Sequence, residues 1–431
     1  MVNLSDNHYF ESYLIDRIIE NCQTTFNYSN ESTIIASPSK HDPDYWYEWV
    51  RDAAIVINML LDLVICNKVD YNRIKNILIN YVENNIIYQN YALNNTYVQD
   101  GDCHFFVTLG EPKFNTDLSV FSKHWGRPQN DGPALRAIAM MKYANYLHNC
   151  NNCAKTTFAK NDFIKKYLYD SKWPETDSLI KRDLEYIAKC WNDRCFDLWE
   201  EIYGHHFYTL TVQQKALELG HHFAIHMGDK HAGDHYLNVS KKIGEFIKSH
   251  FYHNDTILSS IHINNSHNHQ RYLDSSIILA FIHSNKSYDA ELANTIANMV
   301  VSFKQEYKIN HKNKNMYIGR YNNDHYYGGN PWVLTTGALA YFLLTVDMNN
   351  IDKKKLNDTF LNLFGSSNEE LRKHGIDVIK SLMDIENHNQ SHKSHLSYAE
   401  QFDKNNKKYL SANKLTWNYV ELLRSFICIK N

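Results

Sequence analysis

The chain contains few residues that interrupt helices. Its 431 residues include only 7 Pro and 15 Gly, the two residue types that most disfavour a helix interior. The alternating pattern of a half-buried strand is also scarce, and the best short candidate runs from Thr256 to Ile263. No Pro- or Ser-rich linker and no repeat of fixed period divides the chain. These absences favour a single all-α domain over residues 1–431, either a helical toroid or an irregular helical fold.

Long apolar runs and strong charge are also missing. The longest apolar stretch, Ala53 to Cys66, has 14 residues and contains Asn58 and Asp62, so it is too short and too polar to span a bilayer. The net charge is −3, without the concentrated basic face that nucleic-acid binding needs. The N-terminus lacks a basic segment followed by an apolar one, which predicts no secretory signal and an intracellular protein. We therefore expect neither a membrane nor a nucleic acid as a partner.

The eight cysteines do not predict a metal site. Without an export signal, reduced thiols are the expected state. Cys150 and Cys153 have the spacing of zinc ligands, but four residues instead of two separate Cys190 from Cys195. No motif requires calcium or an organic group. We expect no metal and no cofactor.

Apolar residues recur at helical spacing along most of the chain. Between Ile55 and Val64, for example, Met59, Leu60 and Leu63 follow the period of a helix. About a dozen helices are predicted in this way. Their expected ranges are 8–23, 55–64, 74–82, 133–149, 176–193, 209–220, 232–250, 272–284, 289–306, 332–346, 367–384 and 413–428. The polar segment 386–396 is expected to be a loop.

Five segments between these helices are rich in Trp, Tyr, Asp, Glu, Arg and Gly. Function concentrates in loops that a rigid scaffold holds. The five are SPSKHDPDYWYEWVRD (37–52), WGRPQNDGPALR (125–136), DLWEE (197–201) followed by GHHFYT (204–209), GRY (319–321) running to YYGGNPW (326–332), and AEQFD (399–403) followed by LTW (415–417).

Together these segments resemble the glucoamylases of glycoside hydrolase family 15, over roughly residues 35 to 420. The resemblance implies a single (α/α)6 barrel of six outer and six inner helices, with the active site in a funnel at one end. It also implies a glucan 1,4-α-glucosidase. Such an enzyme hydrolyses α-1,4 bonds, and α-1,6 bonds more slowly, from the non-reducing ends of glycogen, starch and maltooligosaccharides, and it releases β-D-glucose with inversion.

Inverting hydrolysis needs two carboxyl groups. One protonates the leaving oxygen, and the other activates water on the opposite face of the sugar. The resemblance places the general acid at Glu200 and the general base at Glu400. Both could instead be ordinary solvated loop glutamates, but each lies inside a complete motif.

The resemblance also assigns sugar-binding and supporting positions. Arg51 and Asp52 match the pair that grips the hydroxyls of the terminal glucose, although a structural ion pair at a helix start is the alternative. Arg320 and Glu201 match residues that hold the next sugar. The aromatic walls, whose faces stack on pyranose rings, are assigned to Tyr45, Trp49, Trp125 and Trp332, with Trp125 in the position that supports the acid. Trp199 is also assigned to substrate binding and is expected to pack against Glu200. Supporting polar roles are assigned to Asp197, Asp324 and Gln401. In contrast, Arg127, Asp131 and Arg136 are expected to form a buried polar network that shapes the second segment.

Several features depart from the family pattern or leave alternatives open. No starch-binding domain is recognised, which favours soluble glucans and glycogen as substrates and a monomer that resembles the sporulation-associated yeast enzymes, in the cytosol or a vacuole. A truncated gene model is the alternative explanation. Asn130, Gly328 and the pair His205-His206 differ from the usual residues and could alter preference for the second sugar. The alternative functions are an (α/α)6 hydrolase of trehalose or other α-glucosides, and an inactive glycan-binding relative.

Overall fold

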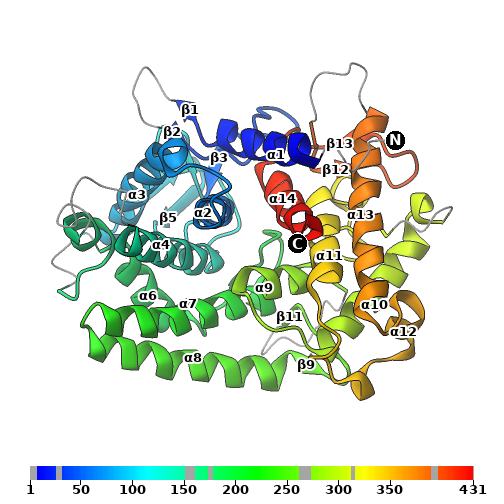
Figure 1. The fold of residues 1–431 in the computed structure, drawn as a ribbon. Coiled ribbons are helices and arrows are strands. Elements are labelled where there is room, and N and C mark those ends of the chain that lie inside the picture. The colour runs from blue at the N-terminus through cyan, green and yellow to red at the C-terminus, as the bar shows by residue number, and fades with distance from the viewer. Residues whose placement is uncertain are drawn as a thin grey trace. The chain divides into compact units, whose positions relative to one another are not determined.

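The computed structural model describes residues 7–25, 32–150, 161–172, 178–261, 273–311, 316–389 and 397–430. The chain divides into two compact units, each built mainly from helices (Figure 1). The first unit comprises Met1–Asn21, Ser37–Trp46 and Ser249–Asn431, and the second unit comprises Cys22–Ala36 and Tyr47–Lys248.

The second unit carries the helices of the N-terminal half. They are α2 (Val50–Ile65), α3 (Tyr71–Leu93), α4 (Asp131–Asn149), α6 (Leu179–Cys190), α7 (Phe207–His226), most of α8 (Lys230–His250) and the π-helical turn η2 (Ile164–Leu168). Its short strands are β1 (Thr24–Thr25), β2 (Ser32–Thr33), β3 (Tyr47–Trp49), β4 (Tyr97–Asp100), β5 (Cys103–Phe106), β6 (Lys113–Asn115), β7 (Cys195–Phe196) and β8 (Tyr203–His206). The antiparallel pairs within this unit are β1–β2, β3–β6, β4–β5 and β7–β8.

Helix α4 organises the packing of the second unit. It packs against α2, α6 and α7, and its Ala134, Ala137 and Ala139 are fully buried. Such small side chains allow neighbouring helices to approach closely. Helix α2 begins directly after β3, so its first turn presents Arg51 and Asp52 beside the β3–β6 ladder.

The first unit carries the remaining helices. They are α1 (Asn7–Asn21), α9 (Ser276–Ser284), α10 (Ala290–Glu306), α11 (Val333–Thr345), α12 (Asp358–Phe364), α13 (Asn368–Asn389) and α14 (Thr416–Lys430), with 3-10 turns η3 (Lys308–Asn310), η4 (Tyr326–Gly328) and η5 (Lys353–Lys355). Its strands are β9 (Tyr252–His253), β10 (Thr256–Ile257), β11 (Ser260–Ile261), β12 (Gln401–Phe402) and β13 (Tyr409–Leu410), of which β9 pairs with β10 and β12 with β13.

Helix α11 is a buried apolar helix of the first unit and packs against α9, α13 and α14 (Figure 1). A buried charge network joins two of these neighbours. Glu421 of α14 lies 3.0 Å from His283 Nε2 of α9 and 3.2 Å from Arg424 Nε. Burial opposes ionisation of Glu421, but Arg424 and His283 lower its pKa to about 2. The carboxylate is therefore ionised and satisfied inside the helical core.

All the predicted helices are present, most of them with small shifts at their ends. The exceptions include the helix expected at 74–82, which continues to Leu93 as α3, and the helix expected at 55–64, which begins at Val50 as α2. The short α12 was not predicted, because one turn or two of apolar periodicity does not stand out from a loop. The expected loop 386–396 is wrong for 386–389, which continue α13, and its remainder lies outside the described residues. The strand candidate at Thr256 to Ile263 contains β10 and β11, and its last two residues are not described.

The cysteines correct one expectation. Cys150, which directly follows α4, is disulfide-bonded, so it is not the reduced thiol expected from the missing export signal. The other cysteines in the described ranges are free. None of the helices in these ranges combines the length and the apolar character needed to span a bilayer.

The expected buried network of the second segment is present only in part, as separate ion pairs in which Arg136 and Asp131 are buried and Arg127 is half-buried. Arg136 is 1% exposed and pairs with Asp183 at 2.6 Å, while Asp131 is likewise 1% exposed. Arg127 binds the buried Glu111 at 3.0 Å.

Arg136→Met tests how much stability this network supplies. Because the change leaves Asp183 buried without its main partner, we expect the free energy of unfolding to fall by about 3–5 kcal/mol. Urea unfolding followed by far-UV circular dichroism measures it. The control is Lys142→Met, which breaks a partly exposed pair with Asp62 and is expected to cost no more than about 1 kcal/mol. Equal losses in both variants would contradict the assignment.

Candidate active site

The structure divides the predicted site residues between the two units. The second unit holds Trp49, Arg51, Asp52, Trp125, Asp197, Trp199, Glu200 and Glu201. The first unit holds Tyr45, Arg320, Asp324, Trp332, Glu400 and Gln401. Within each unit, most of these side chains contact one another directly or through one neighbour.

A tight turn between β7 and β8 presents Glu200. The buried Asp197 Oδ1 accepts hydrogen bonds from the backbone N–H groups of Glu201 at 2.7 Å and Ile202 at 2.9 Å. The N–H of Glu200 itself donates to the Asp197 carbonyl at 2.9 Å. Glu200 has a φ of +67°, in the left-handed region that side chains disfavour. The Asp197 side chain therefore holds a turn that would otherwise relax, which is a structural supporting role.

The contacts of the Glu200 carboxyl group converge on one of its oxygens. Trp49 Nε1 donates to Oε1 at 2.7 Å, and Gln129 Nε2 donates to the same atom at 2.9 Å. Arg51 Nη2 lies 3.8 Å from it. The side chain is 17% exposed. Oε1 thus accepts hydrogen bonds from two fixed N–H groups. Because an O–H group on Oε1 would compete with these donors, a proton on this carboxyl group is placed on Oε2.

Arg51 links this carboxyl group to the start of α4. Its Nη1 donates to Gln129 Oε1 at 2.9 Å and to Asp131 Oδ2 at 3.0 Å, and its Nε lies 3.4 Å from Asp52 Oδ2. Burial raises the pKa of Asp52 to about 6, although Arg51 lowers it. Asp52 Oδ2 accepts no hydrogen bond from the part of the chain that the structure describes.

Aromatic side chains line this group of residues. Trp49 is 5% exposed and its ring centroid lies 6.2 Å from that of Trp125, which is 36% exposed. Trp199 is buried and Glu201 is exposed. The position expected to support the acid was Trp125, whereas the direct hydrogen bonds to Glu200 come from Trp49 and Gln129.

In the first unit, backbone pairing fixes Glu400 just before β12. Its N–H donates to the Ala412 carbonyl at 2.8 Å, and its carbonyl accepts from Val333 N–H, at the start of α11, at 3.2 Å. An isolated antiparallel bridge between Trp332 and Gln401 continues this contact. Glu400 therefore lies on a rigid junction between α11 and the β12–β13 hairpin.

The Glu400 carboxyl group is 1% exposed. Burial raises its pKa to about 7, while hydrogen bonds from Ser411, Gln401 and Tyr45 lower it. Ser411 Oγ and Gln401 Nε2 both donate to Oε2, the latter at 3.2 Å. Tyr45 in turn shares a 2.9 Å hydrogen bond with the phenol of Tyr326.

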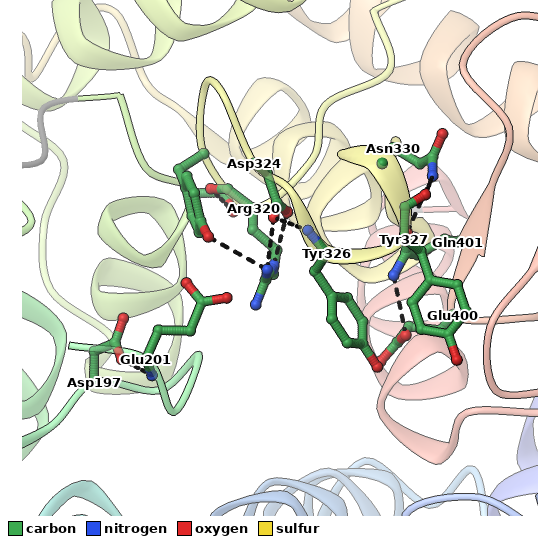
Figure 2. Close-up of polar contacts among 12 residues, drawn as sticks. Asp197, Glu201, Arg320, Asp324, Tyr326, Tyr327, Asn330, Glu400 and Gln401 are labelled. Carbon is green, nitrogen blue, oxygen red and sulfur yellow. Dashed lines mark hydrogen bonds and ion pairs between the residues drawn. The ribbon is translucent and has the colours of Figure 1, made fainter. Parts of the chain in front are cut away.

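Arg320 and Asp324 form a bidentate pair beside these residues (Figure 2). Arg320 Nε lies 2.8 Å from Asp324 Oδ2, and its Nη2 lies 2.7 Å from Oδ1. Tyr326 N–H also donates to Asp324 Oδ1, at 2.9 Å. The Arg320 guanidinium lies 5.4 Å from the ring centroid of Trp332, which is 6% exposed. Asp324 thus sets the direction of Arg320 and the course of the loop that leads to Trp332.

Sequence reasoning missed four residues that contact the predicted ones. Gln129 lies within the second motif, but only the fold shows that it joins Arg51 to Glu200. Ser411 lies between the two parts of the fifth motif, and Tyr326 begins a motif string without an assigned role. Lys113 lies outside every motif. Among the described residues, no group of three or more His, Cys, Asp or Glu side chains could hold a metal ion.

The helical fold, with carboxyl groups lined by hydrogen-bond donors, is that of an (α/α)6-barrel glycoside hydrolase. The structure matches the solved "Glycoside Hydrolase Family 15 Glucoamylase from Hypocrea jecorina" with a TM-score of 0.79 at 28% identity, over 99% of this chain and 72% of that one. This match confirms the predicted all-α fold class. The chain belongs to the glycosyl hydrolases family 15, whose sequence model matches residues 12–427.

Curated relatives agree with this membership. The chain is 30% identical to Glucoamylase-1 of Schizophyllum commune, over 91% of this chain and 68% of the relative. It is 31% identical to "Glucoamylase, intracellular sporulation-specific" of Saccharomyces cerevisiae, over 79% of this chain and 63% of that protein. The chain therefore spans about two thirds of the length of these two relatives. The predicted family resemblance is confirmed, and the chain is a glycoside hydrolase.

The turn that carries Glu200 gives a test with a matched pair of variants. Asp197→Ala removes the acceptor of two backbone N–H groups, so Glu200 is displaced and kcat on maltose is expected to fall about 10- to 100-fold. Asp197→Asn keeps the Oδ1 acceptor and is expected to stay within about threefold of wild type. Steady-state glucose release measures both, and equal falls would show that the charge of Asp197, not the turn, matters.

Proposed function

We propose that this chain is a glucan 1,4-α-glucosidase, a glucoamylase, that releases β-D-glucose from non-reducing ends with inversion. The activity predicted from the five motifs is confirmed by the family match and by relatives that carry this name. The proposal assigns the general acid to Glu200 and the general base to Glu400. The observation that carries the acid assignment is the convergence of the Trp49, Gln129 and Arg51 contacts on one oxygen of Glu200.

In the proposed first step, Glu200 Oε2–H donates its proton to the glycosidic oxygen as the bond to C1 breaks. Positive charge then develops at C1, as in an oxocarbenium ion. The resulting Glu200 carboxylate keeps the N–H donors of Trp49 and Gln129 on Oε1, and Arg51 lies nearby. Because these donors are already in place, they stabilise the developing negative charge without reorganisation.

In the same step, ionised Glu400 takes a proton from water while the water oxygen forms the new bond to C1 from the opposite face. A buried carboxylate is more basic than a solvated one, and its pKa of about 7 makes Glu400 an effective base near neutral pH. Hydrogen bonds from Ser411, Gln401 and Tyr45 offset part of the rise in pKa that burial causes, so the ionised form of Glu400 stays populated near neutral pH.

The Arg51–Asp52 pair supports recognition of the terminal glucose. Among the described residues, the buried Asp52 Oδ2 accepts no hydrogen bond and has only the 3.4 Å ion pair with Arg51 Nε, so a sugar hydroxyl that donated to it would recover free energy lost on burial. Trp49, Tyr45, Trp125 and Trp332 are proposed as aromatic walls, and Trp199 as a further substrate-binding residue. For the second sugar we propose Arg320, which Asp324 orients, and the exposed Glu201. Gln401 supports the base through its 3.2 Å hydrogen bond.

Proton NMR of the wild type with maltoheptaose tests the reaction and both carboxyl assignments. We expect β-glucose to appear before mutarotation produces the α-anomer, because inversion at the α-linkage gives the β-product. Glu200→Gln and Glu400→Gln are expected to lower kcat at least about 100-fold, since general acid–base catalysis typically supplies that much.

Other outcomes of that experiment identify the alternatives. Early release of α-glucose would contradict inversion. A folded wild type that releases glucose from trehalose but not from maltoheptaose would identify the other α-glucosidic hydrolase. Absence of hydrolysis of either sugar would favour the non-catalytic glycan-binding protein.

The acidic limb of the pH profile tests the environment of Glu400. Ser411→Ala removes a donor that stabilises the ionised carboxylate, so the pKa of Glu400 rises further above its usual value. Activity that requires the ionised base is lost as pH falls through this pKa, and the acidic limb of kcat is therefore expected to move to higher pH. Profiles of wild type and Ser411→Ala on maltose give the shift, and Ser411→Thr, which keeps a hydroxyl, is the control. An acidic limb that stays in place or moves to lower pH would exclude this role for Ser411.

We further propose glycogen and soluble maltooligosaccharides as substrates, and one catalytic domain over residues 1–431 that acts as a monomer. The family match over residues 12–427 supports the single domain. Light scattering after size-exclusion chromatography tests the monomer, and a mass of twice the 50.7 kDa chain would contradict it.

We also propose an intracellular location, in the cytosol or a vacuole and associated with sporulation. The support is the similarity to the yeast relative whose name is intracellular and sporulation-specific. Fractionation of expressing cells tests this location, and recovery of the protein mainly from the medium would refute it.

A further inference from the structure

A buried ammonium group lies behind the proposed acid. Lys113 is the first residue of β6 and is 1% exposed. Its Nζ lies close to the faces of four aromatic rings, at centroid distances of 4.6 Å for Tyr47, 4.3 Å for Trp49, 4.1 Å for Phe121 and 3.2 Å for Trp125. We call Lys113 and these four rings the lysine cage.

The four rings also contact one another in a closed cycle. Centroid distances around the cycle are 5.9 Å for Tyr47–Trp49, 6.2 Å for Trp49–Trp125, 5.7 Å for Trp125–Phe121 and 5.2 Å for Phe121–Tyr47, all edge-to-face. Edge-to-face contacts and cations over ring faces both restrict ring orientation. The ammonium and the cycle therefore fix one another.

Burying an ammonium group is costly, so its retention here needs a reason. The electron-rich ring faces replace part of the lost hydration. Lys113 also lies near the buried carboxyl group of Glu111. Burial raises the pKa of Glu111 to about 7, while the charges of Arg127 and Lys113 lower it. Lys113 is too deeply buried to contact a sugar directly. Any effect of Lys113 on the reaction must therefore act through the residues around it.

The β3–β6 ladder connects the lysine cage to Glu200. Trp49 is the direct antiparallel partner of Lys113, so their side chains stand on the same face of the ladder. The Trp49 indole presents its face to the ammonium and its Nε1–H to Glu200 Oε1 at 2.7 Å. A cation over the ring draws electron density from the indole and makes this N–H a stronger donor, in addition to holding its direction.

We propose that Lys113 is a positioning residue of the general acid, because its caged ammonium orients Trp49 and strengthens the hydrogen bond that holds Glu200 for proton transfer. The proposal rests on the acid role proposed for Glu200. It predicts a specific defect in leaving-group protonation, which general loss of stability would not produce.

Two substrates separate these effects. Maltose has a sugar leaving group that needs a proton, whereas α-D-glucosyl fluoride has a leaving group that departs with little acid assistance. In Lys113→Met, kcat on maltose is expected to fall about tenfold or more, and kcat on the fluoride less than about threefold. Lys113→Arg, which keeps the cation, is expected to recover part of the maltose rate. Lys142→Met is the control for loss of a lysine in the same unit and is expected to change neither rate.

Trp49→Phe keeps a ring in the lysine cage but removes the N–H donor, so it should show the same difference between substrates. If Lys113 acts through this N–H, Lys113→Met adds little to the maltose defect of Trp49→Phe. Equal falls on both substrates in folded Lys113→Met, or an unchanged maltose rate, would overturn the proposal. If Trp49→Phe shows the difference and Lys113→Met does not, the N–H matters but the lysine does not.

Glu200→Gln distinguishes a failure of this proposal from a failure of the proposed function. The acid role requires that Glu200→Gln lose far more activity on maltose than on the fluoride. Where it loses both equally, the assignment of the acid is wrong. Where Glu200→Gln shows the difference and Lys113→Met does not, only the role of Lys113 is wrong.

Discussion

The position of one oxygen, Glu200 Oε1, constrains much of the second unit. Two hydrogen-bond donors reach it, Trp49 at the end of β3 and Gln129 just before α4, and the Arg51 guanidinium in the first turn of α2 lies 3.8 Å away. Because α2 and α4 pack directly on one another, these donors keep fixed mutual distances. Among the described residues these contacts all fall on Oε1, so the other carboxyl oxygen has a defined direction, which the proposed proton donor to a bound sugar requires.

Backbone strain accompanies the polar side chains in both units. Glu200, Ser411 and Tyr327 have φ values of +67°, +66° and +52°, and a non-glycine residue in this region costs roughly 1–2 kcal/mol. Local hydrogen bonds oppose relaxation of these turns. Asp197 Oδ1 accepts two N–H groups beyond Glu200, and Asn330 Nδ2 donates to the Tyr327 carbonyl at 2.7 Å. Strain at the proposed reactive groups accords with turns shaped for geometry more than for stability. It is not confined to them, because non-glycine residues with positive φ also occur elsewhere, for example at Asn67 and Asn254.

The sequence predicts the fold class and the motif residues better than it predicts their contacts. Helices such as α2 and α6 have clear apolar periodicity, whereas α12 is too short to be seen and the polar end of α13 resembles a loop. The motifs indicate both glutamates because their neighbours are distinctive. They do not show that Trp49 rather than Trp125 donates to Glu200, because this depends on how β3 and the turn after β7 are oriented. The role proposed for Lys113 could not be predicted from the sequence. A single lysine outside the motifs is expected on the surface, and only the fold brings the four aromatic rings around it.

The environment of Glu400 matches the base role proposed for it. Removal from water raises the pKa of its carboxyl group to about 7, which increases its basicity, and donors from Ser411, Gln401 and Tyr45 limit that increase. Burial alone would leave the group protonated and inactive over most of the physiological range, whereas the donors alone would make it a weak base. The balance requires both the backbone junction with α11, which buries Glu400, and the β12–β13 hairpin, which brings Ser411 beside it. The pKa of Glu400, and with it the proposed base role, therefore depends on two opposing effects that the fold supplies from different elements.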